Sequence, residues 1–123
     1  MAEAYKRLGG VAATTTNFST STTSGAQVLY QVPALTSAVI SSIVICNQAA
    51  TSATYRLGVD VAGTIAVPPT AYTLAGYLVF GATIAANDSV VLTLGATLAT
   101  ANSLLFSASA TTVNAVAFGT EIT

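Results

Sequence analysis

The stretch Ala38-Val39-Ile40-Ser41-Ser42-Ile43-Val44-Ile45-Cys46 decides the fold class of this chain. β-Branched residues dominate it, and its apolar side chains do not recur with the spacing of a helix face. The stretch is too short to cross a bilayer, and two serines lie in its middle. It therefore predicts a buried strand whose two faces are both mostly covered by protein.

Turn-forming residues divide the rest of the chain into further short segments. Pro33 precedes the central stretch, Asn47-Gln48 follow it, and Gly, Pro and Asn punctuate the remainder. The predicted strands cover residues 28–32, 38–46, 53–61, 77–84, 89–94, 104–108 and 113–118. Such strands without a convincing helix predict an all-β fold, an antiparallel β-sandwich that is either immunoglobulin-like or a jelly roll.

The segment 53–61 alternates apolar and polar residues along its length. Tyr55 and Leu57 fall on one side of the predicted strand, and Arg56 and Asp60 on the other. This pattern predicts a half-exposed strand whose polar face carries both charges.

Residues 1–26 are expected to form an extended N-terminal arm, and residues 27–123 a single β-sandwich domain. The Gly, Ala, Thr and Ser residues of the arm have little to bury, so it is either a flexible leader or an arm that orders on a partner. Spaced apolar residues favour the docking arm: Tyr5, Leu8, Val11 and Phe18. Gly9-Gly10 are interpreted as a hinge between arm and body.

The composition limits the classes of partner. Hydrophobic residues make up 53% of the chain and charged residues 6%, against about 25% in ordinary soluble domains. With so few charged residues, electrostatic repulsion between free monomers would be weak. Much of the surface is therefore expected to contact other protein. A net charge of −1 with three basic residues argues against nucleic acid, and no apolar window is long enough for a membrane span. The first residues do not resemble a secretory signal, which favours cytoplasmic synthesis.

Enzymatic chemistry has little support in the sequence. The chain contains no His, and its scattered carboxylates include no pair that the sequence places together. Cys46 is expected to be a buried, inert thiol, and Asn87-Asp88 a turn rather than a calcium site. We therefore expect a protein that is not an enzyme, with no catalytic residue, cofactor or metal.

Two tyrosines are candidate contact residues. Tyr72 and Tyr77 flank the end of a connection that contains Pro68-Pro69. Exposed there, they would be interface anchors or stacking platforms for sugar. The alternative is that they are core-edge residues with solvated hydroxyls.

Several blocks, taken in order, cover almost the whole chain: Tyr5-Lys6-Arg7-Leu8-Gly9, Val28-Leu29-Tyr30-Gln31-Val32-Pro33, Ser42-Ile43-Val44-Ile45-Cys46-Asn47, Ala53-Thr54-Tyr55-Arg56-Leu57, Ile84-Ala85-Ala86-Asn87-Asp88, Leu92-Thr93-Leu94-Gly95 and Phe118-Gly119-Thr120-Glu121-Ile122. Together they resemble small virion structural proteins of tailed bacteriophages such as cyanophages. The resemblance implies a part of the virion without fixing which part.

The leading hypothesis is a capsid decoration, or cement, protein that binds and stabilises neighbouring major capsid subunits without chemistry. The alternative is a tail, neck, baseplate or fibre component, for which contact with the host surface is one option, and a third class is a lectin-like module. Expected partners are the major capsid protein or other virion proteins and further copies of the chain, with a trimer favoured and the virion as location. Candidate partner-binding residues are Tyr5, Lys6, Arg7, Leu8, Phe18, Tyr72 and Tyr77.

Overall fold

The computed structural model describes residues 3–12, 27–60 and 77–123. They form eight strands, which are β1 (Glu3–Ala12), β2 (Gln27–Gln31), β3 (Ser37–Asn47), β4 (Ala53–Asp60), β5 (Tyr77–Ile84), β6 (Ser89–Leu98), β7 (Ser103–Ala108) and β8 (Val113–Ile122). Each predicted strand overlaps one of β2 to β8, and the all-β prediction is confirmed. None of the described residues forms a helix long and apolar enough to span a bilayer.

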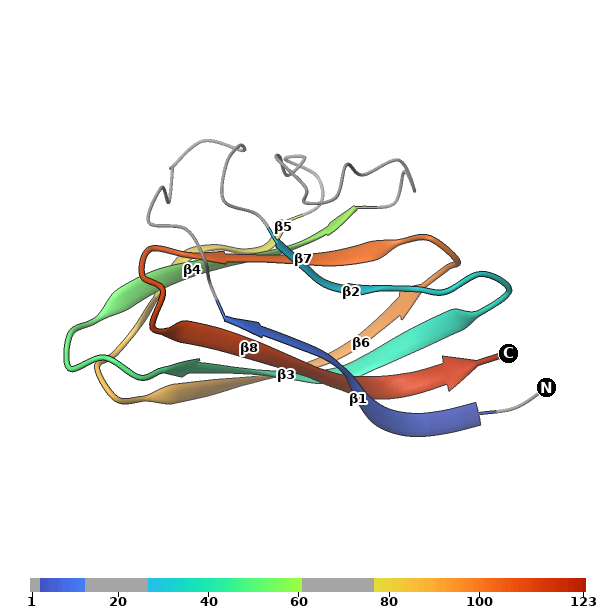
Figure 1. The fold of residues 1–123 in the computed structure, drawn as a ribbon, viewed down its shortest axis with the longest axis horizontal. Helices are drawn as coiled ribbons and strands as arrows, with labels where there is room; N and C mark the ends of the chain where they lie inside the picture. Colours follow the sequence, from blue (N-terminus) through green and yellow to red (C-terminus); the bar gives the residue numbers. More distant parts are fainter. Residues whose placement is uncertain (1–2, 13–26, 61–76) are drawn as a thin grey trace.

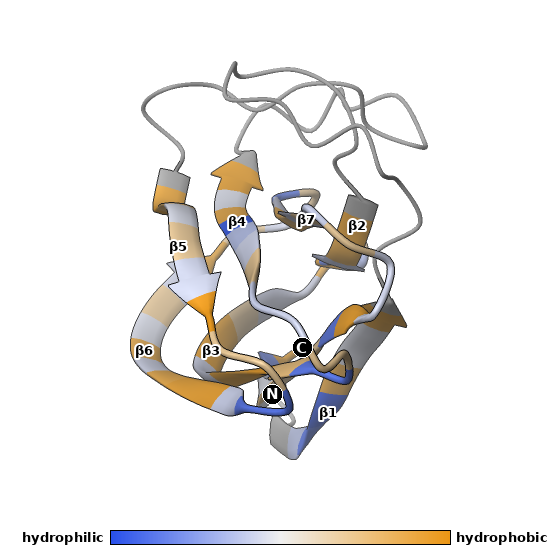
Figure 2. Ribbon diagram, turned by 90° about the vertical axis from the view of Figure 1, so that its left-hand side faces the viewer, coloured by the Kyte–Doolittle hydropathy of each residue, from blue (hydrophilic) through white to orange (hydrophobic). Residues whose placement is uncertain are grey.

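The strands make two four-stranded antiparallel sheets that lie face to face as a β-sandwich (Figure 1). Sheet 1 has the order β1-β8-β3-β6, and sheet 2 has the order β2-β7-β4-β5. The chain crosses between the sheets at most of its turns, so strands that follow one another in sequence mostly lie in different layers. Figure 2 shows apolar residues distributed along the strands of both layers.

Along the central strand β3, the alternation of inward and outward side chains shifts by one residue. Its fully buried apolar residues are Ala38, Ile40, Ile43 and Ile45. Ile40 and Ile43 are three residues apart and still face the same side, because the register with β8 shifts between Ile40 and Ser42, where one extra residue is accommodated. The paired serines of the sequence therefore mark a β-bulge. The residues between the buried ones remain partly exposed, so β3 is completely buried on one face only.

The strand that is buried on both faces is β7, in which all six residues are buried. Its neighbour β4 is covered in the same way around Arg56, which is 1% exposed. The prediction that Arg56 lies on a half-exposed polar face is therefore wrong. Its guanidinium carbon lies 4.6 Å from the ring centre of Phe80 on β5, a cation–π contact that replaces part of its water. The side chain of Asp60 lies outside the described residues.

The described part of the expected arm is an integral strand. Residues Glu3–Ala12 pair with β8, with a register shift between Arg7 and Gly9. Gly9 approaches β2 so closely that a Cβ at this position would collide with the carbonyl oxygen of Leu29. The interpretation of Gly9-Gly10 as a hinge is therefore wrong, because both glycines lie inside β1. Residues 13–26 lie outside the described part, and the domain boundary at residue 26 stays a prediction.

The close approach of Gly9 predicts the effect of a methyl group. Gly9→Ala should lower the free energy of unfolding by about 1–3 kcal/mol, because β1 must move away from β2 to relieve an overpacked contact. Gly95→Ala on β6 is the matched control, since a Cβ there meets nothing within 4 Å. Chemical denaturation measures both variants, and equal stability of the two would contradict the assigned packing.

Candidate partner-binding surface

The outer face of sheet 1 is apolar across its width. Val44 on β3 is paired with Val116 on β8 and with Val91 on β6, so the three valines lie in one row. They alternate with buried residues on β3 and β8 and with partly buried residues on β6, which places their side chains on the side away from the core. Val91 is 61% exposed, whereas Val44 and Val116 are partly buried.

Neighbouring rows carry small hydroxyl side chains and one more large apolar residue. Ser42 is paired with Phe118 on one side and Thr93 on the other, and Val39 with Thr120 and Thr97. We call this surface, comprising Val39, Ser42, Val44, Val91, Thr93, Thr97, Val116, Phe118 and Thr120, the outer face. None of these residues is charged.

Two of the predicted contact residues extend the outer face onto β1. Tyr5 and Arg7 are paired with Thr120 and Phe118, respectively, and both are exposed. Tyr5 is 69% exposed, yet its hydroxyl lies 3.0 Å from Ser41 Oγ. Because Ser41 Oγ donates to the carbonyl of Phe118 at 3.1 Å, it accepts the hydrogen bond from Tyr5. The exposed ring is therefore anchored on the sheet.

Lys6 and Leu8 point to the other side of β1, toward the sandwich. The four predicted contact residues on β1 therefore lie on two different faces. Leu8 packs against the core, with its Cδ1 3.0 Å from where a Cβ on Gly119 would lie. Lys6 Nζ forms an ion pair of 2.6 Å with Glu121 Oε1 on β8. These two residues therefore attach β1 to the sandwich and are less available to a partner than Tyr5 and Arg7.

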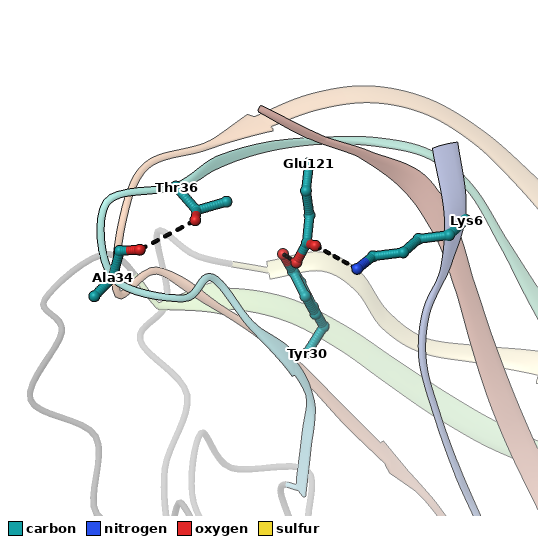
Figure 3. Close-up of polar contacts among 5 residues, drawn as sticks. All are labelled: Lys6, Tyr30, Ala34, Thr36 and Glu121. Atoms are coloured by element: carbon teal, nitrogen blue, oxygen red, sulfur yellow. Dashed lines mark hydrogen bonds and ion pairs between the residues drawn. The ribbon is translucent and has the colours of Figure 1, made fainter. Parts of the chain in front are cut away.

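Glu121 connects the two sheets at the edge formed by β1 and β2. Its second oxygen, Oε2, accepts a hydrogen bond of 2.6 Å from the hydroxyl of Tyr30 on β2 (Figure 3). The side chain of Glu121 is 15% exposed, and that of Lys6 is 52% exposed. One carboxylate thus bridges strands from both layers.

The bridge shifts the acidity of both partners of the hydrogen bond. The hydrogen bond from Lys6, followed by that from Tyr30, lowers the pKa of Glu121. Burial, followed by the hydrogen bond to Glu121 and the charge of that carboxylate, raises the pKa of Tyr30. The structure therefore favours a charged Glu121 beside a neutral Tyr30.

The remaining predicted contact residues are not brought together with the outer face. Phe18 and Tyr72 lie outside the described residues. Tyr77 begins β5 in sheet 2, and its side chain is likewise outside the described part. The valines and Phe118 of the outer face were not predicted as contacts, although their alternation with core residues along β3 and β8 is a signal that the sequence contains.

Among the described residues, no cluster of three or more Cys, Asp or Glu side chains could hold a metal ion. Cys46 is partly buried, in place of the full burial expected. The predicted turn at Asn87-Asp88 is confirmed: Asn87 has a φ of 53°, and the N–H of Ser89 donates to Asp88 Oδ1 at 2.8 Å.

Comparisons of the chain with protein-family models, with curated proteins and with solved structures gave no match.

The ion pair predicts an acid-sensitive contribution to stability. A lowered pKa means that Glu121 stabilises the fold above its ordinary pKa of 4.5, and that this contribution is lost as the pH falls below that value. Glu121→Gln should lower the free energy of unfolding by about 1 kcal/mol at neutral pH and flatten the decline in acid. Thermal unfolding measured in steps of about half a pH unit, from pH 3 to pH 7 for the acid limb and upward from pH 7 for the alkaline limb, tests this.

Tyr30→Phe separates the hydrogen bond from the charge. The raised pKa of Tyr30 stabilises the fold below its ordinary pKa of 10.0, with loss as the pH rises above it, so the variant should flatten the alkaline limb instead. If both variants keep the acid and alkaline limbs of the parent, the bridge does not exist in solution.

Proposed function

We propose that this chain is a non-enzymatic structural protein of a tailed-phage virion, and that it decorates the capsid by binding neighbouring major capsid subunits. The outer face of sheet 1 carries the proposal, because it is broad, uncharged and partly exposed. The resemblance to phage virion proteins supplies the class of particle. The virion is accordingly the proposed location, after assembly in the host cytoplasm.

The physical argument concerns the cost of leaving this face in water. Val44, Val91 and Val116 lie in one row, with Phe118 in the next. Val91 is exposed and the other three are partly buried, and apolar surface gathered in this way is typical of protein interaction sites. Burial of apolar area on a capsid subunit would favour the bound state, and the hydroxyl side chains around it can exchange hydrogen bonds with water for bonds with a partner.

The proposed mechanism is binding without chemistry. A protein that binds only the assembled shell stabilises it in proportion to its free concentration relative to its dissociation constant. Tyr5 is the candidate anchor, because its hydroxyl is held by Ser41 while most of its ring is exposed. Arg7 supplies the one charge beside this face among the described side chains, and it would pair with a carboxylate of the partner.

Further copies of the chain are the second proposed partner. The sequence favoured a trimer, which would match a site of three-fold symmetry on a capsid lattice. No nucleic acid or membrane is proposed as a partner.

Copy number tests the location. Quantitative mass spectrometry of purified virions should give about one copy of this chain per capsid subunit, or per few subunits, because decoration follows the lattice. A handful of copies per particle would place the protein in the tail, neck, baseplate or fibres instead. Absence from virions would overturn the proposal.

A charge in the centre of the outer face tests the surface. Val44→Lys should weaken binding to capsids about ten-fold or more, because an unpaired ammonium would be buried at the contact. Thr111→Lys, in the exposed turn before β8, is the charge-matched control and should bind as the parent does. Equal binding of both variants in a capsid co-sedimentation assay would remove the outer face from the contact.

Deletion of residues 1–25 is the less informative experiment. It removes β1 and with it Lys6 and Leu8, which hold the edge of the sandwich. Loss of binding by such a variant would not distinguish a missing contact from a damaged fold.

A further inference from the structure

The four edge strands of the sandwich differ in how their free backbone groups are protected. An edge strand presents unpaired N–H and C=O groups that can pair with another strand, and proteins usually block this with charge, proline, bulges or short length. Among the described strands, the edges are β1 and β6 in sheet 1, and β2 and β5 in sheet 2. Three of the four carry such protection.

The edge β1 contains Lys6 and Arg7, and its register with β8 shifts beside them. The edge β2 has five residues and is followed by Pro33 after one intervening residue. The edge β5 contains Gly81 at a φ of 66°, and its register with β4 shifts twice. Each of these features interrupts a regular ladder with an incoming strand.

The edge β6 lacks most of this protection. It is ten residues long, Ser89-Val90-Val91-Leu92-Thr93-Leu94-Gly95-Ala96-Thr97-Leu98, with no charged residue and no proline. Exposed residues alternate with partly buried ones from Ser89 to Thr97, and the last residue, Leu98, is buried. Its register with β3 shifts once, between Ile40 and Ser42, which leaves 89–93 as a regular run. Among the described residues, β3 is its single strand neighbour.

The composition of β6 favours a second copy of itself as the occupant. An antiparallel strand pair is self-complementary about a two-fold axis, since each donor on one copy meets an acceptor on the other. Because β6 has no charge, two copies bring no like charges together. A three-fold arrangement built by strand pairing would require β6 to pair with one of the three protected edges. The two-fold pairing avoids them.

We propose that two copies of this chain associate through antiparallel pairing of their β6 strands, which joins the two copies of sheet 1 into one continuous eight-stranded sheet. The outward side chains Val91 and Thr93 of each copy then gain cross-strand neighbours from the other copy. The outer faces of the two copies become one surface. The dimer replaces the trimer that the sequence favoured, and its formation requires no virion component.

The experiment uses the full chain in solution. Sedimentation equilibrium over a range of concentrations should show reversible association from monomer to dimer. Val91→Lys and Thr93→Lys should each raise the dissociation constant about ten-fold or more, because the two-fold axis brings the same added charge from both copies to the contact. Thr111→Lys, which adds the same charge outside β6, should leave the constant unchanged.

Amide hydrogen exchange locates the contact without a substitution. In the parent, the β6 amides that point away from β3 should exchange slowly at high concentration and rapidly at low concentration, whereas amides paired with β3 should be protected at both. A monomer at all concentrations, a trimer, or a dimer whose β6 exchange is independent of concentration would each overturn the proposal. None of these results would alter the expected binding of monomers to capsids. The dimer proposal can therefore be disproved without disproving the proposal of capsid decoration.

Discussion

The sandwich is closed at the edge where β1 meets β2, and its core is shielded from water only because of this closure. Two sheets bury their inner faces only if water is kept out along their sides. Here Leu8 covers the core from β1, and Gly9 allows the backbone of β1 to approach Leu29. The carboxylate of Glu121 then contacts one side chain from each layer, Lys6 on β1 and Tyr30 on β2, and so holds the two edge strands together.

Strand β1 both closes the sandwich and contributes side chains to the outer face. Alternation along β1 directs Lys6 and Leu8 toward the sandwich and Tyr5 and Arg7 toward the outer face. A sequence-based view of residues 1–26 as an arm missed this division. The apolar spacing was visible, but the pairing of β1 with β8 joins segments about a hundred residues apart, which local patterns do not specify.

The positions of the seven later strands could be predicted because β-branched runs and turn residues are local signals. The burial of Arg56 could not, since alternation alone assigns it to a polar face, whereas burial depends on what covers sheet 2. For the candidate surface, Tyr5 was predicted as one of the spaced apolar residues of the arm, and Arg7 lies two residues further on. The row of Val44, Val91 and Val116 required the register of three strands, in which a bulge at Ser41-Ser42 changes the phase of β3.

Hydroxyl-radical footprinting of purified virions and of the free protein, read by mass spectrometry, would show whether other protein covers the outer face of sheet 1, as we propose. Oxidation of Tyr5, Val91 and Phe118 should fall in virions, while Leu35, which is 92% exposed in the turn between β2 and β3, stays as reactive as in the free protein. Equal oxidation of these residues in both samples would mean that the outer face stays exposed to water in the virion.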